Sequence, residues 1–310
     1  MCGRVISRVD IPGLRAMTRA RGSRRSGQLR RGYNIGPASH QAAIVHASRT
    51  SVEEETKPEE CMEIDQNRVL SVMKWGMNNF REKNPEKPMV INIRIESMDY
   101  KFKPFHNNRC VILAEGYYEW KETHPYLVKP KNSDLFYFAG LYRDIDENEQ
   151  EYGIITVPPK ESMFWLHDRS PAMIREENID RWIDPQVSYE EASALIECRE
   201  AEELEYYEVP SLVNQMKNDN KECCMRVEEY QALLKTKGIH RFFKPVEKRK
   251  AEEEESLPAK KIIVAPVGNA SDNKVSIGIS LEKPEIQYDP DNKPKITANV
   301  SSSSTKKEIC

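Results

Sequence analysis

The stretch Cys110-Val-Ile-Leu-Ala-Glu-Gly-Tyr-Tyr-Glu119-Trp120 carries an apolar run into a glycine and then into an acid between aromatic residues. Its branched and aromatic side chains predict a buried strand over 110–118. Aromatic neighbours desolvate a carboxyl group and suit it to general acid chemistry, so Glu119 is a candidate catalytic residue. The alternative is an exposed residue in a turn.

Further segments of the chain predict strands because they are short, rich in Val, Ile, Tyr and Phe, and separated by Pro, Asn, Asp and Lys clusters. These segments are 3–9, 42–46, 69–75, 89–93, 135–142 and 152–157. Helical patterns cover 11–20, 179–182, 189–196 and 227–234, and the first begins with an Asp cap and an early proline. The excess of strands predicts an α+β, strand-dominated domain.

The composition limits the class of protein. The 310 residues are 38% hydrophobic and 31% charged, with a mean hydropathy of -0.72, and no apolar run is long enough to cross a bilayer. The N-terminus lacks the apolar region of a secretory signal, so we expect an intracellular protein without a membrane partner. The 7 Cys are scattered without a CxxC and the 6 His are dispersed, which predicts free thiols, no metal and no cofactor.

The composition changes after Phe243 to runs of Lys, Glu and Ser with almost no aromatic residues. We therefore expect a catalytic domain over 2–243 and a disordered tail over 244–310. The basic clusters Lys248-Arg249-Lys250 and Lys260-Lys261 are compatible with a nuclear import signal or with ordinary solvated charge.

Cys2 becomes a chemically special residue if the initiator Met is removed. An N-terminal cysteine carries an amine with a pKa of about 8 and a thiol with a pKa of about 8.5. The amine condenses with an aldehyde to an imine, and the thiolate then adds to the imine carbon and closes a five-membered thiazolidine. The alternative is that Cys2 is an arbitrary second residue.

Two other segments carry polar side chains in site-like patterns. Extended backbone over 90–96 would place Asn92, Arg94 and Glu96 on one face, opposite the apolar residues. His167 lies among charged neighbours just before a proline, which is typical of a site loop, although a lone histidine is also a common structural residue.

The first 31 residues contain nine Arg and a single acid, Asp10. Such a local positive charge indicates a phosphate-binding surface or, for the Gly- and Ser-containing part 19–31, a solvated and partly disordered loop. Arg4 lies in an alternating apolar strand and is the better candidate for a functional arginine.

Several stretches follow one another in a recognisable order: Met1-Cys2-Gly3-Arg4, Tyr33-Asn34-Ile35-Gly36-Pro37, Lys74-Trp75-Gly76-Met77, Asn92-Ile93-Arg94-Ile95-Glu96-Ser97, Arg109-Cys110, Glu115-Gly116-Tyr117-Tyr118-Glu119-Trp120, Phe138-Ala139-Gly140-Leu141-Tyr142, Ile154-Ile155-Thr156, His167-Asp168-Arg169-Ser170-Pro171-Ala172 and Trp182-Ile183-Asp184. In content and order they resemble the SOS-response-associated peptidase (SRAP) family over residues 2–226.

The resemblance implies a β-rich SRAP fold, in which twisted antiparallel sheets form a barrel-like core with peripheral helices. It also implies an enzyme that captures abasic sites in single-stranded DNA as a covalent DNA–protein crosslink. By this likeness Cys2 is the nucleophile that forms the thiazolidine with the ring-opened sugar. Asn92 orients the Cys2 amine and thiol, Glu119 is the general acid and base, and His167 assists proton transfer and reversal.

The same likeness assigns DNA contacts. Arg4, Arg94 and Arg169 match positions that bind phosphates, and Trp75 and Trp120 match aromatic residues near displaced bases. Guanidinium groups neutralise phosphates and aromatic faces stack on unpaired bases, so the residue types suit these roles. For the two tryptophans, packing in the core is the alternative.

Some positions depart from the family pattern. Ile93 and Ile95 stand where the family usually has small residues, and Glu115 stands where Asp is common. The polar face is unchanged, so we expect the chemistry to be retained.

The segment 236–243 has a second motif, with Ile239, two intervening residues and the pair Phe242-Phe243. This spacing is that of peptides that insert a one-turn helix into the replication sliding clamp. Thr236 occupies the place usually held by Gln, and the alternative is the last amphipathic turn of the domain.

Two other functions compete with covalent capture. One is a non-covalent reader of modified or damaged DNA, in which Cys2 and Glu119 are structural. The other is a cysteine peptidase that uses Cys2 and His167 mainly on its own N-terminus. We expect a nuclear protein at replication forks that acts as a monomer.

Overall fold

The computed structural model describes residues 3–57, 63–78 and 89–236. The chain divides into two units, Met1–Lys250 and Ala251–Cys310, and only the first contains described residues. Cys2, the clamp-like residues Ile239, Phe242 and Phe243, and the tail 244–310 lie outside the described residues, as does the predicted domain boundary.

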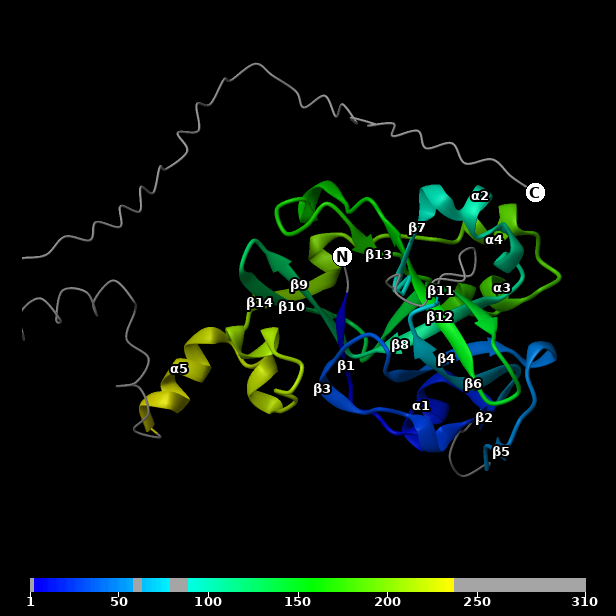
Figure 1. Ribbon diagram of the computed structural model, residues 1–310, viewed down its shortest axis with the longest axis horizontal. Helices are drawn as coiled ribbons and strands as arrows, with labels where there is room; N and C mark the ends of the chain where they lie inside the picture. The colour runs from blue at the N-terminus through cyan, green and yellow to red at the C-terminus, as the bar shows by residue number, and fades with distance from the viewer. Residues whose placement is uncertain (1–2, 58–62, 79–88, 237–310) are drawn as a thin grey trace, which may run out of the picture. The chain divides into compact units, whose positions relative to one another are not determined.

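A five-stranded antiparallel sheet has the strand order β14-β10-β9-β1-β3 (Figure 1). Its strands are β1 (Arg4–Ser7), β3 (Gly32–Ile35), β9 (Gly116–Lys121), β10 (His124–Pro130) and β14 (Leu204–Glu208). The strand β1 lies between β9 and the edge strand β3, so Arg4–Ser7 are held between two neighbouring strands.

A larger sheet has the order β13-β12-β11-β8-β4-β6-β2-β5, with β7 paired to β12. Its strands are β2 (Ala20–Arg24), β4 (His40–His46), β5 (Glu54–Glu55), β6 (Asp65–Trp75), β7 (Asn92–Arg94), β8 (Arg109–Ala114), β11 (Phe136–Asp144), β12 (Gln150–Val157) and β13 (Ser170–Pro171). A short parallel pairing of β12 with β6 closes a ring of five of these strands, so the core is barrel-like but unevenly closed.

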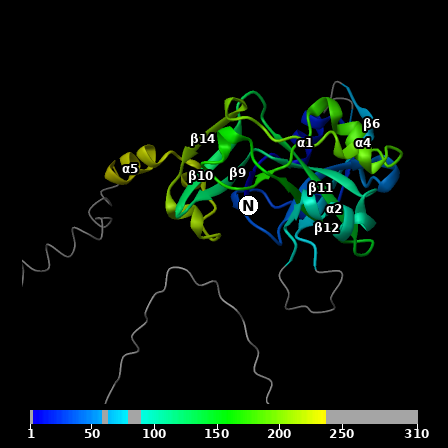
Figure 2. The same ribbon diagram turned by 90° about the horizontal axis from the view of Figure 1, so that it is seen from above.

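The helices are short and peripheral. They are α1 (Ile11–Thr18), α2 (Met98–Lys101), α3 (Ile179–Ile183), α4 (Tyr189–Ser193) and α5 (Val227–Thr236). α1 packs on β2 and α3 packs on β8 and β4. α5 has no fully buried residue and lies beyond β10 and β14, at the end away from β6 (Figures 1 and 2). In the described residues, no helix is long and apolar enough to cross a membrane.

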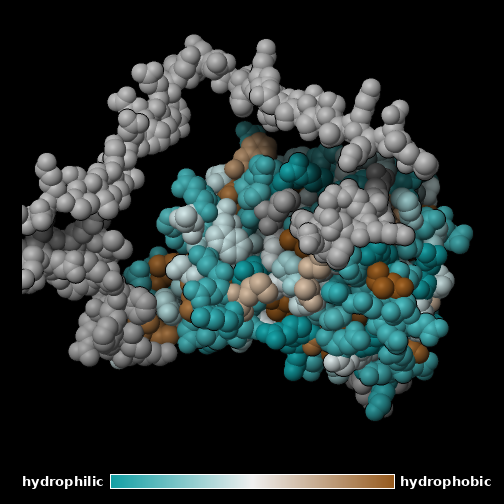
Figure 3. Space-filling model, in the orientation of Figure 1, coloured by the Kyte–Doolittle hydropathy of each residue, from teal (hydrophilic) through white to brown (hydrophobic). Residues whose placement is uncertain are grey.

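The structure confirms the α+β, strand-dominated class. Alternating apolar residues of both sheets fill the interior, and Val5, Ile44, Val111 and Ile154 are at most 2% exposed. Figure 3 shows the outer surface of one face, where hydrophilic residues dominate and hydrophobic ones gather only in small groups.

The single strand predicted over 110–118 is wrong, because the chain changes sheets inside it. β8 belongs to the large sheet and β9 to the five-stranded sheet, with only Glu115 between them. At this corner the Glu115 amide donates to the Ile6 carbonyl at 2.9 Å. A Cβ at Gly116 would lie 3.0 Å from the Val128 carbonyl oxygen, so a glycine is needed where the new sheet begins.

The predicted solvated loop over 19–31 is wrong for its first part, whereas Arg30 and Arg31 at its end are exposed. Residues 20–24 form β2, and Arg25 is 8% exposed, with its guanidinium bonded to Ser71 and Gln150. Burial lowers the pKa of Arg25. Arg15 is also buried and donates to carbonyls of β5. The guanidinium groups of Arg15 and Arg25 thus tie strands together, which gives these two arginines a structural role.

A buried arginine also joins β6 to α3. Arg68 is 1% exposed and donates to both carboxylate oxygens of Asp180, at 2.6 and 2.7 Å, and to the Thr18 carbonyl at 3.1 Å. Burial would raise the pKa of Asp180, but the hydrogen bonds and charge of Arg68 outweigh it and hold that pKa below its usual value.

We expect Asp180→Asn to lower the free energy of unfolding by about 2 kcal/mol at pH 7, because Arg68 loses its paired carboxylate and keeps the more distant charges of Asp65, at 3.5 Å, and Glu176. A depressed pKa stabilises the fold above the unfolded-state value of about 3.9, and this contribution disappears as the pH falls through the folded-state pKa. Urea unfolding at pH 7 and pH 3 measures the difference, which should shrink at pH 3. The exposed Asp134→Asn is the control, and an equal loss at both pH values would contradict the prediction.

Candidate functional site

Glu119 lies on β9 and is only 3% exposed. It faces Tyr126 of β10 across the sheet, and its Oε1 accepts a hydrogen bond from the Trp120 amide at 3.2 Å. The sequence-based alternative of an exposed turn residue is therefore wrong. A carboxyl group largely shielded from water is suited to proton transfer.

His167 reaches this carboxylate from another segment, between the 3-10 turn η6 (Glu161–Met163) and β13. Its Nε2 lies 3.9 Å from Glu119 Oε1. Its Nδ1 accepts the Arg169 amide at 3.0 Å, and Asp168 Oδ1 lies 2.8 Å from the same nitrogen. Nε2 is therefore the ring nitrogen nearer to the Glu119 carboxylate, while Nδ1 is engaged by the segment that carries the histidine.

The two residues line one hollow. Its walls are Tyr117, Glu119, Pro159, Met163, Leu166, His167, Arg169 and Ser170. Apolar side chains thus surround a carboxyl, an imidazole and a guanidinium. The arrangement favours proton transfer in a partly dry environment.

The strand β1 leads the N-terminal end of the chain to this hollow. It pairs with β9 so that Arg4 lies opposite Tyr118, and the next residue toward each strand end is Gly3 on β1 and Glu119 on β9. The far end of β1 is fixed because Glu115 accepts hydrogen bonds from the Arg8 backbone and from its guanidinium, at 2.6 and 3.0 Å for the latter.

Arg169 connects the hollow to the large sheet. Its side chain is 9% exposed, and its two terminal nitrogens donate to Glu96 at 2.7 and 3.1 Å. It also donates to the Thr156 carbonyl of β12 at 2.5 Å. Hydrogen bonding from Arg169 is the main cause that lowers the pKa of Glu96.

The predicted polar face over 90–96 is correct only in part. β7 includes Asn92 and Arg94 and runs parallel to β12, but the chain then enters the 3-10 turn η4 (Ile95–Ser97). Glu96 therefore lies in a 3-10 turn and not on the face of the strand, and its carboxylate pairs with Arg169. Asn92 is half-buried and Arg94 is exposed, both on the sheet that does not contain Glu119.

The predicted DNA-binding aromatics differ in exposure. Trp75 is fully buried, its ring stacked on Tyr152 with centroids 6.3 Å apart, and its indole N–H donates to the Ile91 carbonyl. Core packing, the alternative, is what this environment favours for Trp75. Trp120 is partly exposed and donates to Asn214 Oδ1 at 2.8 Å.

Arg4 is half-buried, and burial lowers its pKa. Its guanidinium donates to Asn34 Oδ1 and to the Val213 carbonyl, both at 2.9 Å. Asn34 donates in turn to carbonyls of Val213, Gln215 and Asn218. This buried network joins β1 and β3 to the segment that also contacts Trp120. The sequence motif contained Asn34, but nothing in its spacing indicated this role.

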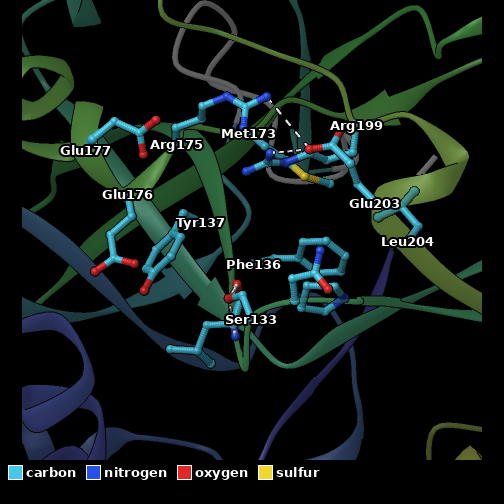
Figure 4. Close-up of a pocket in the computed structure, with 13 residues that line it drawn as sticks. Ser133, Phe136, Tyr137, Met173, Arg175, Glu176, Glu177, Arg199, Glu203 and Leu204 are labelled. Carbon is cyan, nitrogen blue, oxygen red and sulfur yellow. Dashed lines mark hydrogen bonds and ion pairs between the residues drawn. The ribbon is translucent and has the colours of Figure 1, made fainter.

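A second, charged pocket of about 270 Å³ lies between β10, β11 and β14 (Figure 4). Glu203 Oε1 lies 2.7 Å from Arg199 and 3.7 Å from Arg175. The pocket shares no lining residue with the Glu119 hollow. Because its arginines are neutralised by acids of the chain, it does not present a phosphate site.

Comparisons with known proteins give a consistent result. Residues 1–216 match the family described as SOS response associated peptidase (SRAP). The abasic site processing protein YoqW of Bacillus subtilis is 30% identical over 210 residues, which cover 63% of this chain and 86% of its own. The abasic site processing protein HMCES of Gallus gallus is 29% identical, over 83% and 89% of the two chains.

Solved structures agree with the fold. A crystal structure of a protein from Bacteroides thetaiotaomicron matches 73% of this chain and 100% of its own, with a TM-score of 0.58 and 18% identity. One from Bordetella bronchiseptica matches 67% of this chain and 100% of its own, with a TM-score of 0.52 and 14% identity. At these identities the likeness concerns the fold alone.

We expect Asn34→Ala to lower the free energy of unfolding by about 2–3 kcal/mol, because it removes the acceptor of Arg4 and leaves three carbonyls without their amide donor. Urea unfolding measures the loss, with the exposed Asn132→Ala as the control. Hydrogen exchange should also quicken in the segment 213–218. Unchanged stability would show that water replaces the network at no cost.

Proposed function

The chain belongs to the SOS response associated peptidase (SRAP) family, and from this premise we propose that it captures abasic sites in single-stranded DNA through a covalent crosslink to Cys2. Relatives that align over most of their length are named abasic site processing proteins, which supports the substrate class. The covalent step, its residues and its product are the substance of the proposal.

One observation carries the proposal most directly. β1 runs beside β9, so that Gly3 and Glu119 are the next residues beyond the pair of Arg4 and Tyr118. Consecutive Cα atoms are about 3.8 Å apart, so Cys2 is within one residue of the strand end that adjoins the carboxyl group of Glu119. A buried acid, an imidazole and the N-terminal strand therefore converge.

The reaction balances as a condensation followed by an addition. After removal of Met1, the free amine of Cys2 attacks the aldehyde of the ring-opened sugar and gives a carbinolamine. Loss of its hydroxyl as water forms an iminium ion. The thiolate of Cys2 adds its electron pair to the iminium carbon and closes the thiazolidine, with one water released overall.

Glu119 and His167 would move the protons. The carboxyl group of Glu119 donates to the sugar ring oxygen as the ring opens and to the departing hydroxyl of the carbinolamine. Its carboxylate then takes the proton from the thiol. His167, with Nε2 3.9 Å from Glu119 Oε1, takes the proton that the C1 hydroxyl of the sugar loses as the ring opens and passes it to the Glu119 carboxylate, which can then donate a second time. The proton taken from the thiol restores the acid at the end of the reaction.

The remaining candidates would hold the substrate. Asn92 would orient the amine and thiol of Cys2. Arg94 is exposed and suited to a phosphate, whereas Arg169 and Arg4 already bond to groups of the chain and would contact DNA only with their remaining donor capacity. Trp120 is exposed enough to meet a base.

We also propose a cellular setting for this activity. Binding of a sliding clamp by Ile239, Phe242 and Phe243, nuclear residence at replication forks and a monomeric state are consistent with repair of single-stranded DNA at replication. The residues of the clamp-like motif lie outside the described part of the chain.

Intact mass spectrometry after incubation with an oligonucleotide that carries one abasic site tests the proposal. We expect the purified protein to lack Met1 and to gain the mass of the oligonucleotide less one water, with the adduct mapped to Cys2. Cys2→Ala should abolish the adduct and retain some binding to the strand. A processed, folded protein that binds the strand without gaining its mass would be a non-covalent reader.

Glu119→Gln should slow adduct formation about 100-fold or more, because an amide cannot exchange protons with the sugar. The exposed Glu122→Gln, three residues away on the same hairpin, is the matched control and should react at the wild-type rate. If both variants react equally fast, Glu119 has no part in the chemistry.

His167→Ala should slow formation and reversal of the adduct by similar factors of about 10 or more, because a proton-transfer catalyst accelerates both directions. The fraction of protein crosslinked at equilibrium should change little. Transfer of the protein from one labelled oligonucleotide to a second measures reversal. Slower formation with unchanged reversal would limit His167 to the forward reaction.

A further inference from the structure

An exposed aromatic cluster adjoins the Glu119 hollow. It consists of Tyr126 on β10, Tyr206 on β14 and Trp165, which follows η6, with Lys121 of β9 beside them. The Trp165 ring lies 5.2 Å from Tyr126 and 5.4 Å from Tyr206, and Lys121 Nζ lies 5.4 Å from the Trp165 centroid. We call these four residues the aromatic platform.

The platform and Glu119 lie on the same face of the five-stranded sheet. Tyr126 is the direct cross-strand partner of Glu119, and Tyr206 faces Val128, two residues further along β10. Side chains of directly paired residues, and of residues two apart on a strand, point to the same side. Trp165 is also only two residues from His167 in the chain. The platform is therefore continuous with the proposed catalytic group.

Tyr126 is partly buried against the core, but core packing does not account for the rings of Trp165 and Tyr206. Trp165 is 36% exposed and Tyr206 is 37% exposed, while the neighbouring Phe164 is 58% exposed. The ring planes of Trp165 and Tyr126 meet at 81°, which is an edge-to-face contact. Such a contact leaves more of the ring faces uncovered than a parallel stack does. Large aromatic surfaces gathered in water beside a site indicate a binding surface.

We propose that the aromatic platform stacks an unpaired base of the DNA strand next to the abasic site, with Trp165 as the main contact. This inference rests on the proposed function, because it takes single-stranded DNA as the ligand. Every base has a π face, so stacking needs no particular sequence, and Lys121 supplies a cation for the adjoining phosphate. Glu208 on the same face contacts His124 at 2.8 Å.

A stacked base would also explain how a small hollow selects its substrate. The sugar that lacks a base would lie at the mouth of the Glu119 hollow, while the platform takes the base of the next nucleotide. A strand held at the neighbouring base presents the abasic sugar to the hollow in a fixed register. Trp165 is thus a positioning residue, distinct from the groups that transfer protons.

A double-mutant cycle between Trp165 and the flanking base tests the inference. The Cys2→Ala protein, which forms no adduct, is titrated with two oligonucleotides that carry one abasic analogue, flanked either by normal bases or by further baseless residues. Trp165→Ala should weaken binding of the base-flanked strand about 5- to 100-fold, with far less effect on the baseless one. Trp165→Phe should restore most of the affinity, and the exposed Tyr100→Ala should bind both strands like its parent.

Two results would overturn the inference: equal weakening for both oligonucleotides, or no weakening for either. Circular dichroism and thermal unfolding of Trp165→Ala exclude a folding defect, and Trp165→Phe keeps the test valid if the alanine variant is unstable. Crosslinking by the wild-type protein is measured separately. If the wild-type protein fails to crosslink but Trp165→Ala still removes the base-dependent affinity, the covalent proposal is refuted and the platform is supported.

Discussion

The antiparallel pairing of β1 with β9 is the constraint on which the site depends. Main-chain hydrogen bonds fix the register at Arg4 and Tyr118, and side chains lock both ends of β1: Arg8 on Glu115 and Arg4 on Asn34. A slip of one residue would turn every side chain of β1 to the other face of the sheet. The polar clamps therefore define the register that places Gly3, the first described residue, beside Glu119.

The second constraint is the change of sheet at Glu115, which lets one continuous segment serve both sheets. Its first half buries apolar residues in the large sheet, and its second half brings Glu119 to the face of the smaller one. The segment 167–169 connects the two sheets, because His167 lies close to Glu119 of the smaller sheet and Arg169 donates a hydrogen bond to Thr156 of β12 in the large sheet. A rotation of one sheet against the other would separate acid from imidazole.

The sequence predicted most strands and all the longer helices, because alternating Val, Ile and aromatic residues report burial directly. It failed where the determinant was a partner remote in sequence. The division of 110–118 depends on the Ile6 carbonyl, and the turn at Glu96 depends on Arg169. The edge strand β14, with its Glu and Tyr residues, showed no apolar period at all. Glu119 and His167 were found from local composition, whereas their proximity came only from the fold.

The electrostatics of the surface explain why aromatic contacts should carry much of the affinity. Net charge is -3, and three arginines of the hollow and of the β1 segment are bonded within the chain: Arg169 to Glu96, Arg8 to Glu115 and Arg4 to carbonyls. Few counterions would then be released on binding, and a protein of this kind depends less on phosphates than a basic DNA-binding domain does. Stacking supplies free energy that salt does not screen, and it requires a strand whose bases are unpaired. Under the proposed function, stacking on unpaired bases would therefore favour single-stranded DNA without requiring a high positive charge.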